Sequence, residues 1–161
     1  MFLKVLTKNV DLPNGKNMNL EMIDHLGAVL IVPFLNKSEV VMIRQYRASI
    51  DEYLYELPAG TIEAGEDILN CAKREIIEET GYEALDWQEL GFIYPCPGYS
   101  NEKIFIFKAE NLTANKALPQ DEEEIIEVEI FNQEKIKTFL KEGKITDSKT
   151  IAAFVFCGWL K

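Results

Sequence analysis

Apolar residues occur in short runs along this chain, and their spacing predicts strands and helices in alternation. Residues 28–34 are continuously apolar and residues 39–46 form a second run, with the polar segment 36–38 between them. Uninterrupted apolar runs are typical of strands buried on both faces, so we predict two neighbouring central strands joined by a turn. Further strands are predicted over residues 87–94, 103–109 and 125–131, with the polar residues 111–120 as a connector.

The N-terminal pattern predicts a hairpin. Residues 2–8 form a first strand, and residues 11–16 contain Pro13 and Asn14-Gly15, which favour a turn. Beyond the turn, Met18, Leu20 and Met22 alternate with polar residues, which is the two-residue period of a half-buried strand. We assign residues 1–25 to this hairpin and expect its apolar residues to contact a second subunit.

Three helices are predicted in the remainder of the chain. The first covers residues 67–80, ends at Gly81 and has apolar residues at three- and four-residue spacing: Ile68, Leu69, Ala72 and Ile76. The second covers residues 134–142 and ends at Gly143, and the third begins at Ser148 as its cap and ends near residue 160. A chain of 161 residues can bury one core, so residues 1–161 are predicted to form a single domain.

The first predicted helix carries three glutamates on one face. Glu75, Glu78 and Glu79 stand at positions i, i+3 and i+4, so their carboxylates project close together. A solvated acidic face is one interpretation of such a charge run. The other is a site for a hard divalent cation, Mg²⁺ or Mn²⁺ rather than Zn²⁺, because these ions take oxygen ligands. Arg74 precedes Glu78 by four residues and is placed to orient it.

The order of residue types around these glutamates resembles the Nudix box, a signature of a family of pyrophosphohydrolases. The box runs from Gly60 to Tyr82, and only its last position departs, because Tyr82 stands where an aliphatic residue is usual. Its matching positions are Gly60, Glu66, Arg74, Glu75, Ile76, Glu78, Glu79 and Gly81. So many types in register make a specific signal, unlike a lone glycine-rich loop.

The resemblance implies a fold, an activity and a set of metal ligands. The implied fold is α/β, a mixed β-sheet sandwiched between helices, with the N-terminal antiparallel hairpin added to it. The implied activity is hydrolysis of a nucleoside diphosphate linked to a further moiety. The metal ligands would be Glu75, Glu78, Glu79 and a main-chain carbonyl near Ala59, with Glu78 and Arg74 also counted among the catalytic residues.

Outside the box, the chain is most similar to the ADP-ribose pyrophosphatase branch of the Nudix hydrolases. The similar segments are residues 44–47, 56–60 and 97–102, and Pro97 lies close to that branch's marker proline. By similarity, Arg44, Arg47 and Pro97 would bind substrate, with Arg47 on the diphosphate and Glu102 on the terminal ribose. On the residues alone, a surface role for Arg44 and Arg47 is equally compatible. The branch is typically homodimeric, which agrees with the expected role of the hairpin.

A general base is expected from the acidic run at residues 121–124. Metal-bound carboxylates are poor proton acceptors, so another carboxylate is needed to activate water. In the resembled branch it comes from a late loop before a strand, where this run lies. Glu122 and Glu124 share one side of an extended segment, and one or both are expected to act as the base.

Composition narrows the remaining possibilities. The net charge of −10 argues against nucleic acid or an anionic membrane as the main partner. Cys71, Cys96 and Cys157 show no paired spacing, so they are predicted to be free thiols. There is no apolar run of about 20 residues and no secretory pattern at the N-terminus, which predicts a cytoplasmic protein.

Other catalytic arrangements find less support in the residues. His25 is the single histidine, so a Ser-His-Asp arrangement is not indicated, and a structural role is expected for it. The glycine-rich loop of P-loop nucleotidases is missing from the sequence. Three functions stay open: hydrolysis of ADP-ribose or another nucleoside diphosphate sugar, hydrolysis of an oxidised nucleoside triphosphate, and non-catalytic sensing of a nucleotide sugar.

Overall fold

The centre of the fold is the strand β3 (Ala28–Asn36), which carries one of the two predicted central runs. The computed structural model describes residues 4–115 and 126–160. Within them β3 pairs antiparallel with β4 (Glu39–Arg47) and with the short β6 (Ala59–Thr61), and parallel with β8 (Ile104–Ala114). The predicted pair of neighbouring central strands is therefore confirmed.

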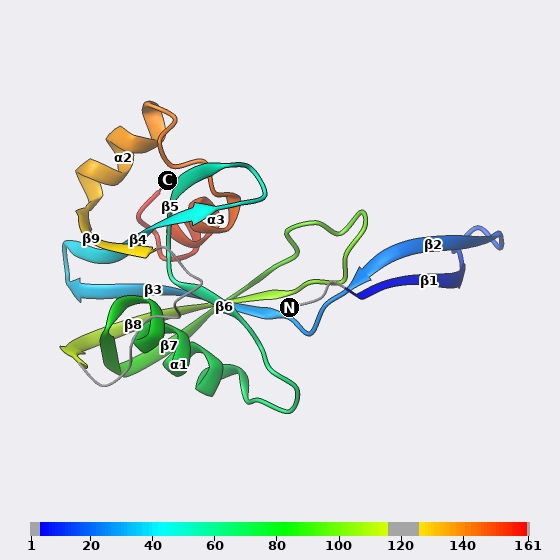
Figure 1. Ribbon diagram of the computed structural model, residues 1–161, viewed down its shortest axis with the longest axis horizontal. Helices are drawn as coiled ribbons and strands as arrows, with labels where there is room; N and C mark the ends of the chain where they lie inside the picture. Colours follow the sequence, from blue (N-terminus) through cyan, green and yellow to red (C-terminus); the bar gives the residue numbers. More distant parts are fainter. Residues whose placement is uncertain (1–3, 116–125, 161) are drawn as a thin grey trace.

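The main sheet is mixed, as predicted. Its strands follow the order β5-β4-β3-β8-β7, with β5 (Glu52–Glu56) and β7 (Tyr82–Ile93) at the ends. The strand β9 (Ile126–Asn132) pairs antiparallel with β4. Helix α1 (Ile68–Thr80) covers one face of the sheet, while α2 (Gln133–Lys141) and α3 (Ser148–Phe156) cover the other (Figure 1). The prediction of a mixed sheet sandwiched between helices is confirmed.

Alternate side chains of β3 supply two separate cores, because successive residues of a strand point to opposite faces of the sheet. Val29 and Ile31 pack with Ala72 and Ile76 of α1. Leu30 and Val32 belong to a second cluster that contains Phe154 of α3. No helix of the described residues has the length and apolarity that a membrane crossing needs.

The helix ends follow local capping rules, and one prediction needs correction. The side chain of Asp67 caps α1, and Gly81 closes it with a φ of 70°. Helix α3 is capped by Asp147, whose carboxylate accepts the Thr150 N–H, rather than by Ser148. It ends at Phe156, short of the predicted residue 160, because Gly158 adopts a left-handed conformation that lets the next two N–H groups bond back to the last turn.

Two strands are longer than their apolar patterns indicate. Residues 111–114, predicted as part of a connector, continue β8, and β7 begins at Tyr82 rather than at Trp87. The extra residues pair with each other, since Tyr82 lies opposite Ala114 and Ala84 opposite Leu112. This end of the β7–β8 pair is mostly solvent-exposed. Its residues are therefore largely polar and do not show the apolar pattern from which strands are predicted. Residues 116–120 of the predicted connector lie outside the described part of the chain.

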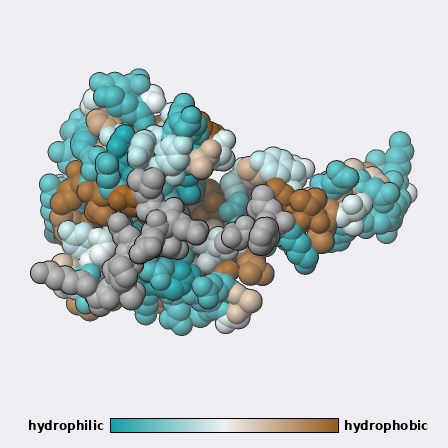
Figure 2. Space-filling model, viewed as in Figure 1, coloured by the Kyte–Doolittle hydropathy of each residue, from teal (hydrophilic) through white to brown (hydrophobic). Residues whose placement is uncertain are grey.

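The N-terminal hairpin is present and projects away from the sheet (Figure 1). It consists of β1 (Lys4–Asp11) and β2 (Asn17–Asp24), so β1 runs three residues past its predicted end at Lys8. Its base is held by the loop before β8, because Ile23 N–H donates to the Tyr99 carbonyl and Asn101 bonds the Asp24 carboxylate. Apolar residues gather on the hairpin where it leaves the body (Figure 2).

A buried hydrogen bond joins α3 to the short connection between β5 and β6. The Thr150 hydroxyl, fully buried, accepts the Leu57 N–H at 2.9 Å. We predict that Thr150→Val lowers the free energy of unfolding by about 1–3 kcal/mol, because it leaves a buried N–H without an acceptor at nearly constant volume. Urea unfolding measures this loss. Thr138→Val on the exposed side of α2 is the matched control, and an equal effect of the two variants would contradict the prediction.

Candidate active site

The carboxylate face of α1 is organised around Arg74. Its guanidinium donates to both carboxylate oxygens of Glu66, to Glu75 at 2.7 Å and to Glu78 at 2.9 Å. Glu78 lies one helical turn after Arg74, while Glu66 reaches the same group from the loop that precedes the helix. A single cation thus holds two of the three carboxylates that the sequence places on one helix face, together with Glu66.

The short strand β6 lies directly against this face. A Cβ atom on Gly60 would lie 1.8 Å from the Glu75 carboxyl carbon, so only glycine permits this approach. On the neighbouring residue, the Ala59 N–H donates to the Glu79 carboxylate at 2.8 Å. Glycine at the first position of the motif therefore brings the backbone of β6 into contact with the helix carboxylates.

These contacts, together with burial, shift the pKa values of the side chains on this face. The hydrogen bonds from Arg74 and from the Glu63 N–H lower the pKa of Glu66 from 4.5 to about 2. The same carboxylates, with Glu66 the largest contributor, raise the pKa of Arg74, so the guanidinium stays charged. Burial raises the pKa of the Cys71 thiol to about 12, which keeps this cysteine protonated and unreactive at neutral pH.

The glutamates fit a divalent cation by their chemistry. Glu75 and Glu79 are buried, with 9% and 3% of their surface exposed, and carboxylate oxygens are the ligands that Mg²⁺ and Mn²⁺ prefer. Over residues 4–115 and 126–160, no three acidic, histidine or cysteine side chains converge on one point. Arg74 lies among Glu66, Glu75 and Glu78 instead, so a bound cation would share the charge compensation that Arg74 provides.

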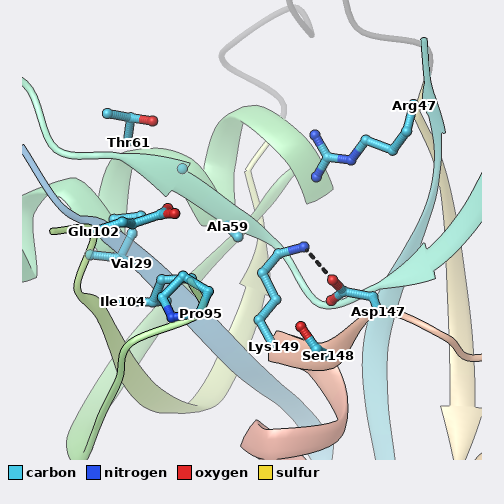
Figure 3. A pocket seen from close by; sticks show the side chains of 12 residues that line it. Val29, Arg47, Ala59, Thr61, Pro95, Glu102, Ile104, Asp147, Ser148 and Lys149 are labelled. Carbon is cyan, nitrogen blue, oxygen red and sulfur yellow. Dashed lines mark hydrogen bonds and ion pairs between the residues drawn. The ribbon is translucent and has the colours of Figure 1, made fainter. Parts of the chain in front are cut away.

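A cavity of about 330 Å³ opens beside β6 (Figure 3). Its walls come from the start of β3, from β6, from Arg47 at the end of β4, and from the first turn of α3. Pro95 and Glu102 of the loop between β7 and β8 complete it. In Figure 3, Arg47 and Lys149 extend from one side, while Glu102 and Thr61 lie on the opposite side.

The structure brings some of the predicted substrate residues together and separates others. Arg47, Glu102 and Ala59 all line the cavity. Arg44 points to the other face of β4, where it lies 4.0 Å from the Tyr53 ring centroid and bonds Glu127. The two arginines are three positions apart, an odd number, so a strand directs them to opposite faces.

The loop between β7 and β8 carries the predicted substrate residue Pro97. Pro97 is solvent-exposed, and it is Pro95 that lines the cavity. Glu122 and Glu124, the predicted bases, lie outside the described residues. His25 lies beside the site, because its Nδ1 accepts the Gly27 N–H and its Nε2 is 3.9 Å from the Glu102 carboxylate.

One residue of the cavity wall, Lys149, and one residue behind it, Glu56, have no role predicted from the sequence. Glu56, at the end of β5, is fully buried and accepts two hydrogen bonds of 2.7 Å from Arg47. Lys149, in the first turn of α3, bonds the same carboxylate and also Asp147. Burial by itself would raise the pKa of Glu56, but the Arg47 hydrogen bond and the Lys149 charge outweigh it, so the pKa is lowered.

Comparison with known proteins decides the family. A family profile described as "NUDIX domain" matches residues 24–154. The chain belongs to the Nudix family. It is therefore a Nudix hydrolase, and the resemblance seen in the sequence is confirmed.

Individual Nudix relatives agree over most of the chain. A protein of Bacillus methanolicus named "Methanol dehydrogenase activator" is 35% identical, covering 94% of this chain and 82% of its own. An "ADP-ribose pyrophosphatase" of Bacillus subtilis is 31% identical, covering 96% and 84%. A solved structure described as "Crystal structure of ADP compounds hydrolase" superposes with a TM-score of 0.81 at 24% identity, over 96% of this chain and 84% of the other, which supports the fold.

The Arg74–Glu66 pair predicts how the stability of this Nudix hydrolase depends on pH. Because the pKa of Glu66 is lowered in the folded state, its contribution is complete above the unfolded value near 4.5 and is lost as the pH falls toward 2. Wild type should exceed Glu66→Gln in unfolding free energy at pH 7, and the gap should narrow below pH 4.5. Urea midpoints at pH 7, 4.5 and 3 measure it.

The control for this prediction is Glu63→Gln, which makes the same chemical change at an exposed residue three positions away. Its difference from wild type should stay small throughout the pH series. A Glu66→Gln difference that is constant from pH 7 to pH 3 would contradict the assigned ion pair.

Proposed function

We propose that this Nudix hydrolase is a metal-dependent pyrophosphohydrolase of ADP-ribose or a related nucleoside diphosphate sugar. With ADP-ribose the products are AMP and ribose 5-phosphate. The observation that carries this proposal is the cavity beside β6, which has two cations on one side, Glu102 on the other, and the box carboxylates packed against β6. A substrate with an anionic diphosphate and a hydroxyl-bearing sugar matches these charges. The predicted cytoplasmic location agrees with such a small soluble substrate.

Each residue is assigned one role in the reaction. The ligands of Mg²⁺ or Mn²⁺ would be Glu75, Glu78, Glu79 and the main-chain carbonyl of Ala59. The bound cation would neutralise charge on phosphate oxygens and make water more acidic. Arg74 keeps Glu78 and Glu75 oriented through its hydrogen bonds. These assignments follow the donor chemistry of the side chains and the Nudix resemblance.

The remaining roles concern the substrate and the attacking water. Arg47 contacts the diphosphate, and Glu102 accepts hydrogen bonds from hydroxyls of the terminal ribose. Glu122 or Glu124 takes the proton of the attacking water, since a carboxylate outside the metal site is needed as the base. Arg44 is assigned no substrate contact, because it faces Tyr53 and Glu127.

Relatives support the substrate class and also name an alternative. Besides the Bacillus subtilis enzyme, a "GDP-mannose pyrophosphatase" of Shigella flexneri is 33% identical over 134 residues. The Bacillus methanolicus relative is named for its action on another enzyme, so a regulatory role by nucleotide-sugar sensing is the second candidate. The complete box, with Arg74 holding three glutamates, favours hydrolysis over sensing alone.

A substrate panel tests the proposal. ADP-ribose, GDP-mannose, other nucleoside diphosphate sugars and an oxidised nucleoside triphosphate are incubated with the protein and Mg²⁺, and phosphate is measured after added phosphatase. The proposal expects the highest kcat/KM for a diphosphate sugar, with ADP-ribose first. Preference for the triphosphate would support the other Nudix activity, and binding of a sugar nucleotide without turnover would support sensing.

The first prediction from this assignment concerns Glu79. Glu79→Gln should lower the turnover of the preferred diphosphate sugar by about 100-fold or more, because a neutral amide loses the charge that holds the cation. The amide oxygen can still accept the Ala59 N–H, so the melting temperature should change little. Glu134→Gln on exposed α2 is the control, and turnover of Glu79→Gln equal to wild type at saturating Mg²⁺ would refute the metal assignment.

The hairpin supports a further part of the proposal, a C₂ homodimer. One hairpin face carries Leu6, Val10 and Leu20, with Met18 41% exposed, and the hairpin extends beyond the body of the chain (Figure 1). An apolar face in this position is stabilised if a second subunit covers it.

Light scattering and sedimentation at micromolar concentration test the dimer. Wild type should be a dimer, and Leu20→Glu should shift it toward monomer because it places a charge in the apolar face. Asn19→Glu is the matched control, since Asn19 lies on the opposite face and bonds Asn9. A monomeric wild type, or equal behaviour of the two variants, would contradict the assigned interface.

A further inference from the structure

Lys149 is a cation of the cavity wall that comes from a part of the chain far from the Nudix box. It lies in the first turn of α3, and 17% of its side chain is exposed. Its ammonium bonds the Glu56 carboxylate and, at 2.9 Å, the Asp147 carboxylate. In Figure 3 the side chain rises from α3 toward the side of the cavity where Arg47 lies. The ammonium is therefore held beside the cavity.

The buried carboxylate of Glu56 fixes the positions of two cations at once. Only 1% of its side chain is exposed, and it is bonded by Nε and Nη2 of Arg47 as well as by Lys149. Burying a carboxylate is costly unless cations and hydrogen bonds compensate it, so this arrangement is strongly determined. Glu56 does not itself line the cavity, whereas Arg47 and Lys149 do.

Both cations retain donors for a ligand. An ammonium has three N–H donors, and the described residues take two of those of Lys149, one each by Glu56 and Asp147. The guanidinium of Arg47 has five, of which two go to Glu56. The side chains of Arg47, Lys149, Glu56 and Asp147 sum to zero charge, and Asp147 lines the cavity beside the two cations. The wall therefore attracts an anion through the remaining donors of Arg47 and Lys149 and not through a net excess of positive charge.

We propose that Lys149 is a phosphate-binding residue that forms a two-cation clamp with Arg47, and that Glu56 positions both. The proposal rests on the proposed function, because the anion it describes is the diphosphate of the substrate. The clamp holds the diphosphate at the wall opposite Glu102, so that the terminal sugar reaches the loop that carries Pro95 and Glu102. A purely structural Lys149, serving only to neutralise Glu56, is the contrasting account.

The affinity for ADP-ribose in the absence of metal distinguishes a phosphate-binding Lys149 from a purely structural one. ADP-ribose is titrated by calorimetry into wild type, Lys149→Met and Lys149→Arg in EDTA, so that cations bound to the box contribute nothing. Lys149→Met should bind about 10- to 100-fold more weakly, the effect of losing one charge-assisted hydrogen bond. Lys149→Arg keeps the charge and should recover much of the affinity. Lys137→Met, which removes a surface lysine of α2, should bind as wild type does.

Steady-state kinetics add a second readout. Lys149→Met should raise KM by a similar factor, and Glu56→Gln should do so as well because it releases both cations. Affinity and KM of Lys149→Met equal to wild type, with an unchanged melting temperature, would overturn the proposal. A wild type that neither binds nor hydrolyses any diphosphate sugar would refute the proposed function, and the clamp with it.

A measurement on the wild type covers the case that Lys149→Met does not fold. Lysines are reductively methylated with and without saturating ADP-ribose, and the rate at each lysine is read by mass spectrometry. ADP-ribose should slow modification of Lys149 and leave Lys137 unchanged. Equal rates at Lys149 with and without ADP-ribose, under conditions where binding is shown by calorimetry, would overturn the clamp.

Discussion

The compensation of negative charge around Arg74 is the interaction on which the active site depends. Three carboxylates from α1 and its preceding loop meet one guanidinium, and without it their repulsion would oppose the helix packing onto β6. Gly60 leaves room for the Glu75 carboxylate, because a Cβ atom there would overlap its position. The ends of α1 are then fixed by Asp67 and Gly81, so the carboxylate face keeps one orientation toward the strand.

A second charge cluster complements the first across β6. Glu56 is buried between Arg47 and Lys149, and Thr150 of the same helix turn bonds the Leu57 N–H. These contacts join the end of β4, the connection between β5 and β6, and α3 at one point of the cavity wall. An acidic protein needs such local cations to accept a phosphate ligand, because its overall field repels anions.

The sequence predicts the parts of this arrangement that depend on local periodicity. The helix period alone places Glu75, Glu78 and Glu79 on one face and Arg74 beside Glu78, and continuous apolar runs identify β3 and β4. The strand period also separates Arg44 from Arg47, although similarity to the family grouped them. Polar pairing at the exposed end of β7 and β8 gave no apolar signal, so residues 111–114 were missed as strand.

Contacts between distant segments cannot be read from such patterns. Lys149 and Glu56 are 93 residues apart, and a lysine in the first turn of a helix resembles any surface lysine until the fold places it beside a buried carboxylate. The hydrogen bond from Asn101 to Asp24, which joins the loop between β7 and β8 to the N-terminal hairpin, is of the same kind. The sequence therefore predicts the carboxylate face of α1, and the structure is needed for the cavity wall that Arg47 and Lys149 form.

We propose that this site directs water to the diphosphate of a nucleoside diphosphate sugar. The most direct test is to incubate the protein with ADP-ribose and Mg²⁺ in ¹⁸O-enriched water and analyse the products by mass spectrometry. We predict AMP and ribose 5-phosphate in equal amounts, with one ¹⁸O atom on the phosphate of only one of them. Intact ADP-ribose, or cleavage at any bond outside the diphosphate, would contradict the account.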